Sequence, residues 1–294
     1  MKTTSKSSVI IGKDSSTPLT ANRPGYGTMR LTGEGIWGEP KNRPEALQIL
    51  RKAVDLGVNY IDTADYYGPG VTNRLITEAL FPYASDLIIG TKVGAKRGGD
   101  KSWNFFGKPE QLRESVNLNL KELKQERLSL VHFRLMPSGG DVFEDSLNAM
   151  FDMQKEGKIL HVGLSNVSRK QLQIALKMGK IASVQNLYGY MQRSTLAGPM
   201  GGAGGEEILD LLEERHIPLI PYFSLQTSLG KGQDKVEEMA KKYRISPAQM
   251  NVVWLLNRSP WILPIPGTTS LSHLEENLKA AEIKLEPEDL AYLG

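Results

Sequence analysis

Eight short apolar runs alternate with eight amphipathic segments along most of this chain. The apolar runs have the length of β-strands and cover residues 24–29, 58–62, 87–92, 128–133, 159–165, 182–186, 218–222 and 262–266. The amphipathic segments repeat apolar residues at helical spacing over residues 44–56, 73–81, 109–123, 143–154, 169–178, 206–215, 236–256 and 270–281. A strand followed by a helix, repeated eight times, indicates parallel strands joined by right-handed crossovers. The sequence therefore predicts an α/β fold, a single (β/α)8 TIM barrel over residues 1–294.

An open, doubly wound sheet is the alternative fold for such a pattern, and it requires a glycine fingerprint after the first strand. The stretch 25–30 is Gly-Tyr-Gly-Thr-Met-Arg, which lacks the third glycine. The glycine-rich run 198–205 does not directly follow a strand and fits no phosphate-loop spacing, so we interpret it as a flexible loop. Residues 1–20 are polar and predict either a loose lead-in or a small hairpin.

The composition excludes several classes of function. The chain has 36 basic and 33 acidic residues, and its net charge of +3 is too small for a nucleic-acid-binding surface. It has no cysteine, which excludes disulfides, thiolate catalysis and cysteine-based metal sites. No run has the length of a membrane span or the apolar core of a signal peptide. We therefore expect a cytoplasmic protein, monomeric and without nucleic-acid or membrane partners.

Polar side chains stand at the carboxyl ends of the predicted strands, where a barrel of this type carries its active site. The second strand ends at Asp62, with Tyr67 in the loop that follows, and the next two strands end at Lys92 and His132. The three residues at the strand ends have ordinary alternatives. Asp62 could cap a helix, Lys92 could extend its charge to solvent, and His132 could be structural. All these alternatives would have to hold at one rim of the same barrel, so we interpret the four residues together as an active site.

These four side chains have the chemistry to reduce a carbonyl group. Tyr67 is a weak acid with an ordinary pKa near 10, and a nearby cation such as Lys92 is expected to lower that pKa. Asp62 can hold the lysine charged and in place, and His132 can donate a hydrogen bond to the carbonyl oxygen. Tyr67 is then the proton donor, a role that contributes about 10²- to 10⁴-fold in rate. No pair of histidines has the spacing of zinc ligands, so no metal site is predicted.

A hydride donor is also needed, and the other strand ends have groups suited to a nicotinamide cofactor. Ser165, Asn166 and Gln185 can donate to and accept from a carboxamide, and Tyr222 offers a flat face for the nicotinamide ring. The segment 267–270, Gly-Thr-Thr-Ser, precedes a predicted helix and could cradle a phosphate. An ordinary helix cap is the alternative interpretation of that segment.

Over nearly its whole length the chain resembles the aldo-keto reductase family. The matching motifs lie, in the same order and spacing, at residues 27–29, 62–68, 91–92, 130–132, 163–166, 184–186, 265–268 and 273–277. The resemblance implies NADP(H) as cofactor and a catalytic tetrad of Asp62, Tyr67, Lys92 and His132. It also implies cofactor contacts from Gly27, Thr28, Met29, Ser165, Asn166, Gln185, Tyr222, Ser224, Leu225, Lys231, Gly267, Thr268, Thr269, His273, Glu276 and Asn277.

Within that family the chain is most similar to bacterial pyridoxal reductases, through the stretches 33–40, 66–73 and 94–98. That group reduces pyridoxal with NADPH, so the resemblance implies a small-molecule carbonyl substrate, a planar aromatic aldehyde. The aldehyde could stack on Tyr66 or Trp103, with the loop 93–108 as one wall of the cleft. Arg134 could meet an anionic group of the substrate or point to solvent.

Two departures from the family pattern keep alternatives open. Many members carry Lys and Arg where this chain has Gly267 and His273, so the preference for NADPH over NADH is open. His132 is followed by Phe133-Arg134 and not by the Trp or Asp-Pro often found there. The alternative functions are a broad-specificity aldehyde or ketone reductase, a cofactor-binding regulatory subunit with little turnover, and a lyase or isomerase in which Lys92 forms a Schiff base.

Overall fold

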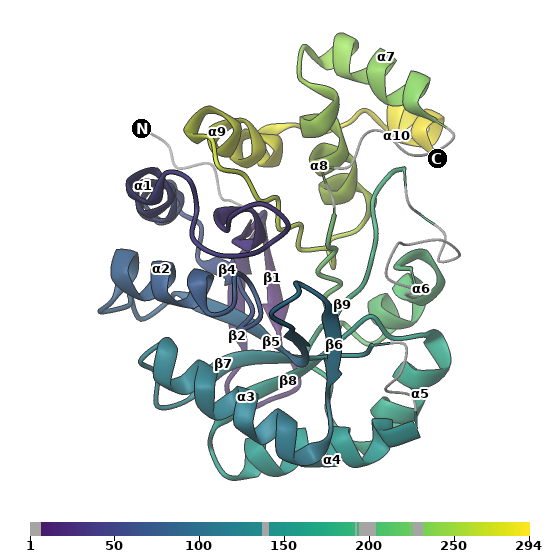
Figure 1. Cartoon of the computed structure of the whole chain (residues 1–294). Helices are drawn as coiled ribbons and strands as arrows, with labels where there is room; N and C mark the ends of the chain where they lie inside the picture. The colour runs from purple at the N-terminus through teal and green to yellow at the C-terminus, as the bar shows by residue number, and fades with distance from the viewer. Residues whose placement is uncertain (1–6, 137–140, 192, 194–203, 224, 226–231) are drawn as a thin grey trace.

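Parallel strands form a closed barrel in the computed structural model, which describes residues 7–136, 141–191, 193, 204–223, 225 and 232–294 (Figure 1). Six barrel strands are hydrogen-bonded in the order β3 (Tyr26–Gly27), β4 (Tyr60–Asp62), β5 (Ile88–Arg97), β7 (Leu128–Arg134), β8 (Ile159–Ser165) and β9 (Val184–Gln185). The last two predicted strands are reduced to isolated parallel bridges, which link Val184 to Leu219, Leu187 to Tyr222 and Leu219 to Ile262. The Gly25 N–H donates to the carbonyl of Pro264 at 2.9 Å and closes the ring. The predicted barrel is confirmed.

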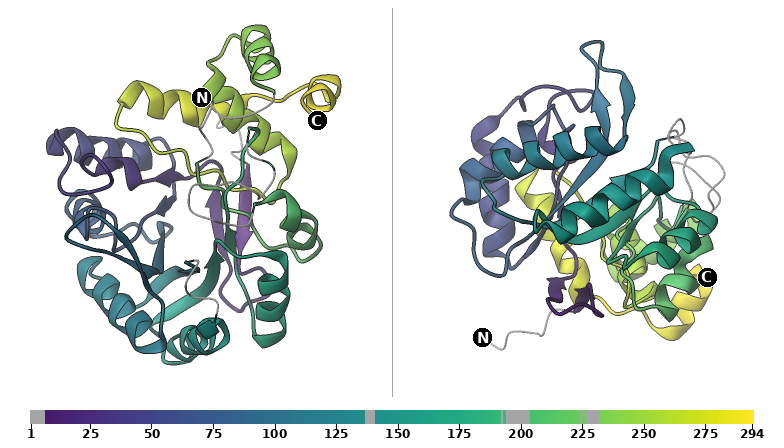
Figure 2. Two further views of the ribbon diagram at one scale, coloured as in Figure 1. Left: turned by 45° about the vertical axis from the view of Figure 1, so that its right-hand side comes forward. Right: turned by 90° about the horizontal axis from the view of Figure 1, so that it is seen from below.

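Helices follow the strands and surround the barrel (Figures 1 and 2). They are α1 (Arg43–Asp55), α2 (Val71–Leu80), α3 (Pro109–Glu122), α4 (Phe143–Lys155), α5 (Arg169–Met178), α6 (Glu206–Glu214), α7 (Gln233–Tyr243), α8 (Pro247–Arg258), α9 (Leu271–Lys279) and α10 (Pro287–Leu293). Short 3₁₀ turns, η1 (Met29–Leu31) and η3 (Ala280–Glu282), follow β3 and α9. Among the helices of these described ranges, none combines the length and apolar character needed to cross a membrane.

The single helix predicted over residues 236–256 is wrong, because two helices, α7 and α8, occupy this stretch. Arg244 takes a left-handed backbone conformation (φ 57°) directly after α7 and ends it. Ser246 then caps α8 by accepting a hydrogen bond from the Gln249 N–H, and Pro247 is the first residue of that helix. Proline lacks the N–H that a continuous helix would use at this position, so the chain must begin a new helix there.

A hairpin covers the end of the barrel at which the parallel strands begin. Its strands β1 (Ser8–Ile11) and β2 (Leu19–Asn22) pair antiparallel, so residues 7–22 form the small hairpin that was one of the two predictions for this region. Val9, Ile11 and Ala21 are buried against inward-facing residues of the barrel strands, including Tyr60 and Leu130. The hairpin therefore seals one end of the barrel with apolar side chains.

A second hairpin stands where the sequence predicted a loop over residues 93–108. β5 continues to Arg97 and pairs antiparallel with β6 (Trp103–Phe106). In the right-hand view of Figure 2 this blue hairpin and the purple hairpin of β1 and β2 lie at opposite ends of the molecule. The β5–β6 hairpin therefore extends the wall of the barrel beyond the carboxyl ends of the strands.

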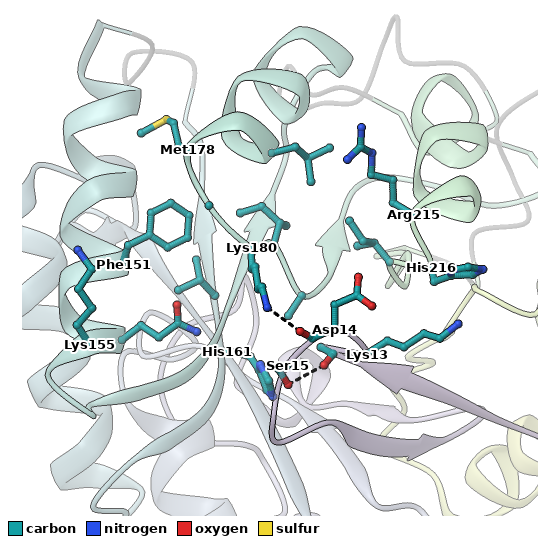
Figure 3. A pocket seen from close by; sticks show the side chains of 18 of the residues that line it. Lys13, Asp14, Ser15, Phe151, Lys155, His161, Met178, Lys180, Arg215 and His216 are labelled. Carbon is teal, nitrogen blue, oxygen red and sulfur yellow. Dashed lines mark hydrogen bonds between the residues drawn. The ribbon is translucent and has the colours of Figure 1, made fainter.

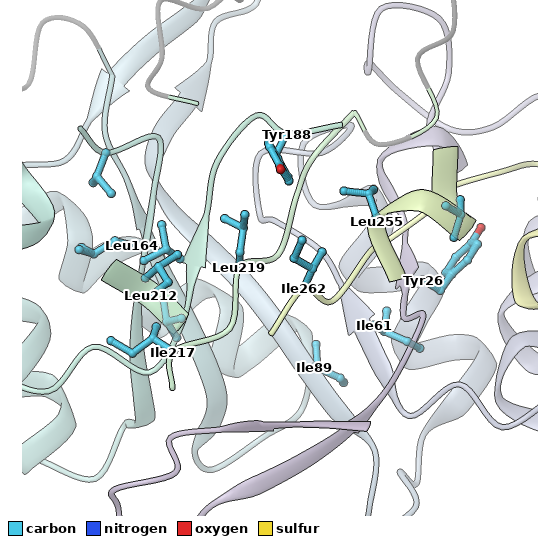
Figure 4. Close-up of a cluster of buried hydrophobic side chains, with 14 of the residues drawn as sticks. Tyr26, Ile61, Ile89, Leu164, Tyr188, Leu212, Ile217, Leu219, Leu255 and Ile262 are labelled. Carbon is cyan, nitrogen blue, oxygen red and sulfur yellow. The ribbon is translucent and has the colours of Figure 1, made fainter. Parts of the chain in front are cut away.

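Alternation along the strands separates the outer core from the barrel interior. Ile61 and Ile89 lie in the core cluster between strands and helices, which Figure 4 shows together with Leu219 and Ile262. Tyr60 and Leu130 belong to the interior cluster that packs on the hairpin. Because side chains alternate along a strand, the residues two positions after these interior ones also face the barrel axis, nearer the carboxyl end. This alternation places the candidate site.

Candidate active site

The centre of the candidate site is a buried ion pair between two barrel strands. Lys92 Nζ donates to Asp62 Oδ1 at 2.5 Å and to the carbonyl oxygen of Thr63 at 2.9 Å. Both charged residues are only 2% exposed. A nucleophilic amine would have to give up this proton and these hydrogen bonds, so the arrangement favours a fixed ammonium and argues against a Schiff-base lysine.

Strand register brings the predicted residues together. Asp62 lies opposite Gly90 in the pairing of β4 with β5, and Lys92 lies opposite His132 in the pairing of β5 with β7. Burial raises the pKa of Asp62, and this effect is opposed by the charge of Lys92 and by the hydrogen bonds that the carboxylate accepts. The attraction between the two charges and the hydrogen bonds to the carboxylate therefore offset the cost of burying the ion pair.

Tyr67 lies beside the ion pair but is a weaker acid than the sequence indicated. Its ring centroid is 4.9 Å from Lys92 Nζ, and the residue is 7% exposed. Burial raises the pKa of Tyr67, and the charge of Asp62 raises it further, whereas Arg134 lowers it. The expectation that Lys92 gives a lowered pKa is wrong in net direction, because desolvation of a phenolate outweighs the nearby cations. Tyr67 therefore carries its proton at neutral pH.

His132 is held by a residue that the sequence analysis missed. Its Nε2 is 2.9 Å from Ser183 Oγ, and its Nδ1 is buried without a hydrogen-bond partner. A Cβ on Gly163 would lie 2.6 Å from the imidazole and 2.9 Å from Ser183 Oγ, so glycine makes room for this pair. Ser183 lies two residues before Gln185 and faces the same side, which was the available signal. The predicted donation to a substrate oxygen would have to come from Nδ1.

Burial and the positive charge of Lys92 lower the pKa of His132 to about 3. Because this pKa lies far below neutrality, the imidazole stays neutral throughout the ordinary working range. We predict that titration of His132 causes no fall in kcat/KM for carbonyl reduction between about pH 8 and pH 5. Steady-state rates across this range, with cofactor saturating, would check this, and a titration near pH 6.5 that disappears in His132→Gln would contradict it.

Gln185 is hydrogen-bonded to the Asp62 carboxylate, a contact that the sequence did not predict. Its Nε2 donates to Asp62 Oδ2 at 2.8 Å, although the residues are 123 positions apart. Its Oε1 is buried and has no hydrogen-bond partner within the part of the chain that the structure describes. This acceptor is free for a ligand, which is the behaviour expected of a group that binds a carboxamide N–H.

Ser165, Asn166 and Tyr222 surround the same region. Ser165 lies opposite Gln185 in the strand register, and Asn166 is the next residue, in a left-handed conformation with φ 64°. Tyr222 OH donates to Asn166 Oδ1 at 3.0 Å, and Asn166 Nδ2 donates to the carbonyl of Leu135 at 3.0 Å. The four residues predicted for the nicotinamide are thus brought together by strand ends that are distant in sequence.

The cofactor-contact residues predicted at the end of the first strand hold the backbone of Asp62. Thr28 uses both its N–H and its Oγ1 to donate to the Asp62 carbonyl oxygen, at 3.0 and 2.9 Å. Gly27 is paired with Asp62 in the β3–β4 register, and Met29 is half-buried. Because the Thr28 hydroxyl hydrogen is used in this bond, Thr28 positions the end of β4 at Asp62 directly.

The predicted phosphate segment begins helix α9. Ser270 caps this helix by accepting a hydrogen bond from the His273 N–H, and Ser270 N–H donates to Thr268 Oγ1 at 3.1 Å. The capping interpretation is therefore correct for Ser270. The other residues predicted for the adenosine end of the cofactor differ in burial. Thr268 and Asn277 are buried, Gly267 is half-buried, and Thr269, His273 and Glu276 are exposed.

The loop after the seventh predicted strand is described only in part. Leu225 is half-buried and packs on the outer core. Ser224 and Lys231, which were predicted to contact the pyrophosphate, lie outside the described residues, as do residues 198–203 of the glycine-rich run 198–205.

The β5–β6 hairpin forms an aromatic wall next to Tyr67. Tyr66 makes edge contacts with Tyr67 (5.3 Å between centroids) and with Trp103 (5.6 Å). Tyr66 is 3% exposed, which leaves little open ring face for the predicted stacking of a substrate, whereas Trp103 is half-buried. Arg97 braces the wall, because it lies over Trp103 (4.3 Å) and donates to the carbonyls of Ile36 and Gly35.

Asp65 is a buried carboxyl outside the tetrad. It is 7% exposed, and burial raises its pKa to about 8. The folded protein therefore holds this proton between about pH 4 and pH 8, where the unfolded chain has released it. The stability that this proton contributes is fully present below about pH 4, is lost progressively as the pH rises from there, and is gone once the pH has risen through about 8.

We predict that Asp65→Asn removes this loss. Urea unfolding of the wild type and the variant between pH 5 and pH 9 should show the variant gaining stability relative to the wild type up to about pH 8, and no further change above it. Asp152→Asn, at an exposed position, is the control. Parallel stability curves for the wild type and Asp65→Asn would show that Asp65 is ionised in the folded protein.

A cavity of about 450 Å³ lies at the other end of the barrel (Figure 3). It is lined by the turn of the first hairpin, the ends of α4 and α5, and His161 of β8. Exposed cations, among them Lys155 and Arg215, stand around it. The tetrad lies at the carboxyl ends of the strands, so this cavity is separate from the candidate active site.

Within the described ranges, no group of three or more His, Asp or Glu residues is arranged to hold a metal ion.

Comparisons with known proteins agree with this geometry. Residues 25–294 match the Aldo/keto reductase family. The chain is 40% identical over 280 residues to pyridoxine 4-dehydrogenase of Escherichia coli (strain K12), which covers 93% of this chain and 94% of that protein. The crystal structure of the thermostable aldo-keto reductase Tm1743 with the inhibitor epalrestat is similar over 97% of this chain and 98% of its own, with 27% identity and a TM-score of 0.79. The aldo/keto reductase of Klebsiella pneumoniae, solved with NADP and acetate, shares the fold over 98% of this chain and 94% of its own, with 22% identity and a TM-score of 0.77.

Proposed function

Because the chain belongs to the aldo/keto reductase family and is an oxidoreductase, we propose that it reduces pyridoxal, a small aromatic aldehyde, to the alcohol with NADPH. The observation that carries the proposal is the buried Asp62–Lys92 pair beside the protonated Tyr67 at the carboxyl end of the barrel. The proposal for pyridoxal is supported by the similarity to the E. coli protein named pyridoxine 4-dehydrogenase, which extends over nearly the whole of both chains.

The residues around Gln185 fit the nicotinamide end of the cofactor. The unpartnered Gln185 Oε1 is an acceptor for a carboxamide N–H, and the Ser165 and Asn166 side chains lie beside it in the strand register. Tyr222 would hold the ring, and residues 267–277 with the loop after Tyr222 would hold the phosphates and the adenosine. When bound, NADP(H) supplies the hydride for the carbonyl carbon.

The protein's own part of the reaction is to deliver a proton. Tyr67 keeps its proton until the carbonyl oxygen gains negative charge, and then donates its hydroxyl hydrogen to that oxygen. Lys92, fixed by Asp62, stabilises the negative charge that is left on the Tyr67 oxygen. Gln185 and Thr28 hold Asp62 from two sides, so the cation stays in a fixed place during the transfer.

The test is a panel of aldehydes followed by the absorbance of NADPH and, separately, of NADH. We expect kcat/KM for pyridoxal to exceed that for benzaldehyde by at least about tenfold. Equal values would support the alternative, a broad-specificity reductase. No turnover of any aldehyde by a protein that retains NADPH tightly would support a regulatory subunit. The NADPH to NADH ratio would decide the cofactor preference that Gly267 and His273 leave open.

A further inference from the structure

Arg134 is a buried cation at the rim of the candidate site. It is the last residue of β7 and faces the barrel interior on the same side of the strand as His132, two residues earlier. Arg134 is 4% exposed, so the expectation that it points to solvent is wrong. Arginine is rarely buried to this degree unless a partner neutralises it.

The described neighbours of Arg134 do not neutralise its charge. Nη1 donates to the neutral hydroxyl of Ser165 at 3.3 Å, and the guanidinium carbon lies 5.3 Å from the ring centroid of Tyr222. Nη2 is buried and has no hydrogen-bond partner among the described residues. No carboxylate of the described residues lies within 4 Å of the guanidinium, and the nearby Asp62 is already paired with Lys92. Among the described residues, Arg134 thus has both a buried N–H donor without a partner and a charge without a counterion. This combination indicates that an anionic atom of a ligand binds there.

The position of this charge limits which atom of a substrate can meet it. Arg134 is near enough to Tyr67 and to Asp62 for its charge to lower the pKa of both groups. The hydroxyl of Tyr66, which is also buried without a partner, feels the same charge. On the inward face of β7, Arg134 follows His132, which lies opposite Lys92, the neighbour of Tyr67. In the proposed binding mode the carbonyl oxygen faces Tyr67, and the ring substituent next to the formyl group lies on the Arg134 side.

We propose that Arg134 binds an ionised oxygen on the ring carbon next to the formyl group, so that the site selects aromatic aldehydes with a neighbouring phenolate. The inference rests on the proposed aldehyde reductase function and makes it narrower. Pyridoxal has such an oxygen, and plain benzaldehyde does not. A charge-assisted hydrogen bond of this kind contributes about tenfold to a hundredfold in affinity.

The experiment compares 3-hydroxypyridine-4-carbaldehyde with pyridine-4-carbaldehyde, which differ only in the ring oxygen. Neither has the hydroxymethyl group through which pyridoxal closes on its own aldehyde, so the reactive form is comparable. In the wild type we expect kcat/KM for the hydroxylated aldehyde to be at least about tenfold higher. Arg134→Gln should lower that ratio to near unity, mainly through KM, and Arg134→Lys should restore part of it. Arg51→Gln removes the charge of an exposed arginine of α1 and should leave the ratio unchanged.

Two further measurements separate this role from others. If Arg134 only positions Ser165 or Tyr222, Arg134→Gln will lower kcat/KM for both aldehydes equally and weaken NADPH binding, and the proposal is then overturned. In the wild type alone, the preference for the hydroxylated aldehyde should vanish below the pKa of its phenol, which tests the proposal even when Arg134→Gln does not fold. Pyridoxal turnover with no such preference would overturn the inference and leave the proposed function intact, whereas no aldehyde turnover would overturn the function itself.

Discussion

Replacing Tyr67 by phenylalanine is expected to lower kcat by about 10²- to 10⁴-fold, the largest loss from any single atom removed in this site. The variant loses one oxygen from a side chain that is 7% exposed and lies beside the Lys92 ammonium. The ring, its edge contact with Tyr66 and the buried ion pair remain, so the structure around the missing hydroxyl should change little. Binding of NADPH, measured by quenching of tryptophan fluorescence, should stay within about twofold of the wild type.

Tyr66→Phe is the matched control for this prediction. It removes the phenolic oxygen of the neighbouring residue. That oxygen is also buried, and it makes no hydrogen bond to Lys92 or to any other described residue. The loss of kcat should be at least about tenfold smaller than in Tyr67→Phe. Comparable activity in Tyr67→Phe and the wild type would show that another group, or water, delivers the proton.

The barrel, and the gathering of Asp62, Lys92 and His132 on neighbouring strands, could be predicted from the sequence because both follow from local periodicity. Apolar runs of strand length predicted the parallel strands, and the carboxyl end of each run identified Asp62, Lys92 and His132 as neighbours. Register then placed Lys92 opposite His132. The start of α8 was also visible in the sequence, because a proline such as Pro247 favours the first position of a helix, although the helix predicted over residues 236–256 ran through it.

Other features depend on contacts that no local pattern contains. The hydrogen bond from Gln185 to Asp62 joins residues 123 positions apart, and the contact of His132 with Ser183 joins residues 51 apart. The pKa of Tyr67 depends on how completely its ring is buried, which a count of nearby charges does not reveal. Likewise, only the three-dimensional contacts show that Arg134 has no counterion among the described residues.

Removing either partner of the buried ion pair should destabilise the fold strongly, and the two losses should not add in the double variant. Lys92→Met leaves the Asp62 carboxylate in the interior with only the Gln185 amide as a side-chain donor, and we expect a loss of about 3–5 kcal/mol in the free energy of unfolding. Asp62→Asn leaves the ammonium with the Thr63 carbonyl and should also be costly. In the double variant neither charge remains, so its loss should be smaller than the sum of the two single losses by about 1–3 kcal/mol.

An exposed ion pair between β5 and α3 provides the control for this cycle. Lys96 Nζ lies 3.4 Å from Glu114 Oε1, and the two side chains are 57% and 62% exposed. Because water screens such a pair, Lys96→Met and Glu114→Gln should each change the free energy of unfolding by no more than about 1 kcal/mol, with little coupling. Urea unfolding of all the single and double variants at pH 7 supplies both cycles. If Lys92→Met costs no more than Lys96→Met, the Asp62–Lys92 pair is not desolvated as the structure describes, and Lys92 would lack the fixed position from which it is proposed to stabilise the negative charge on Tyr67.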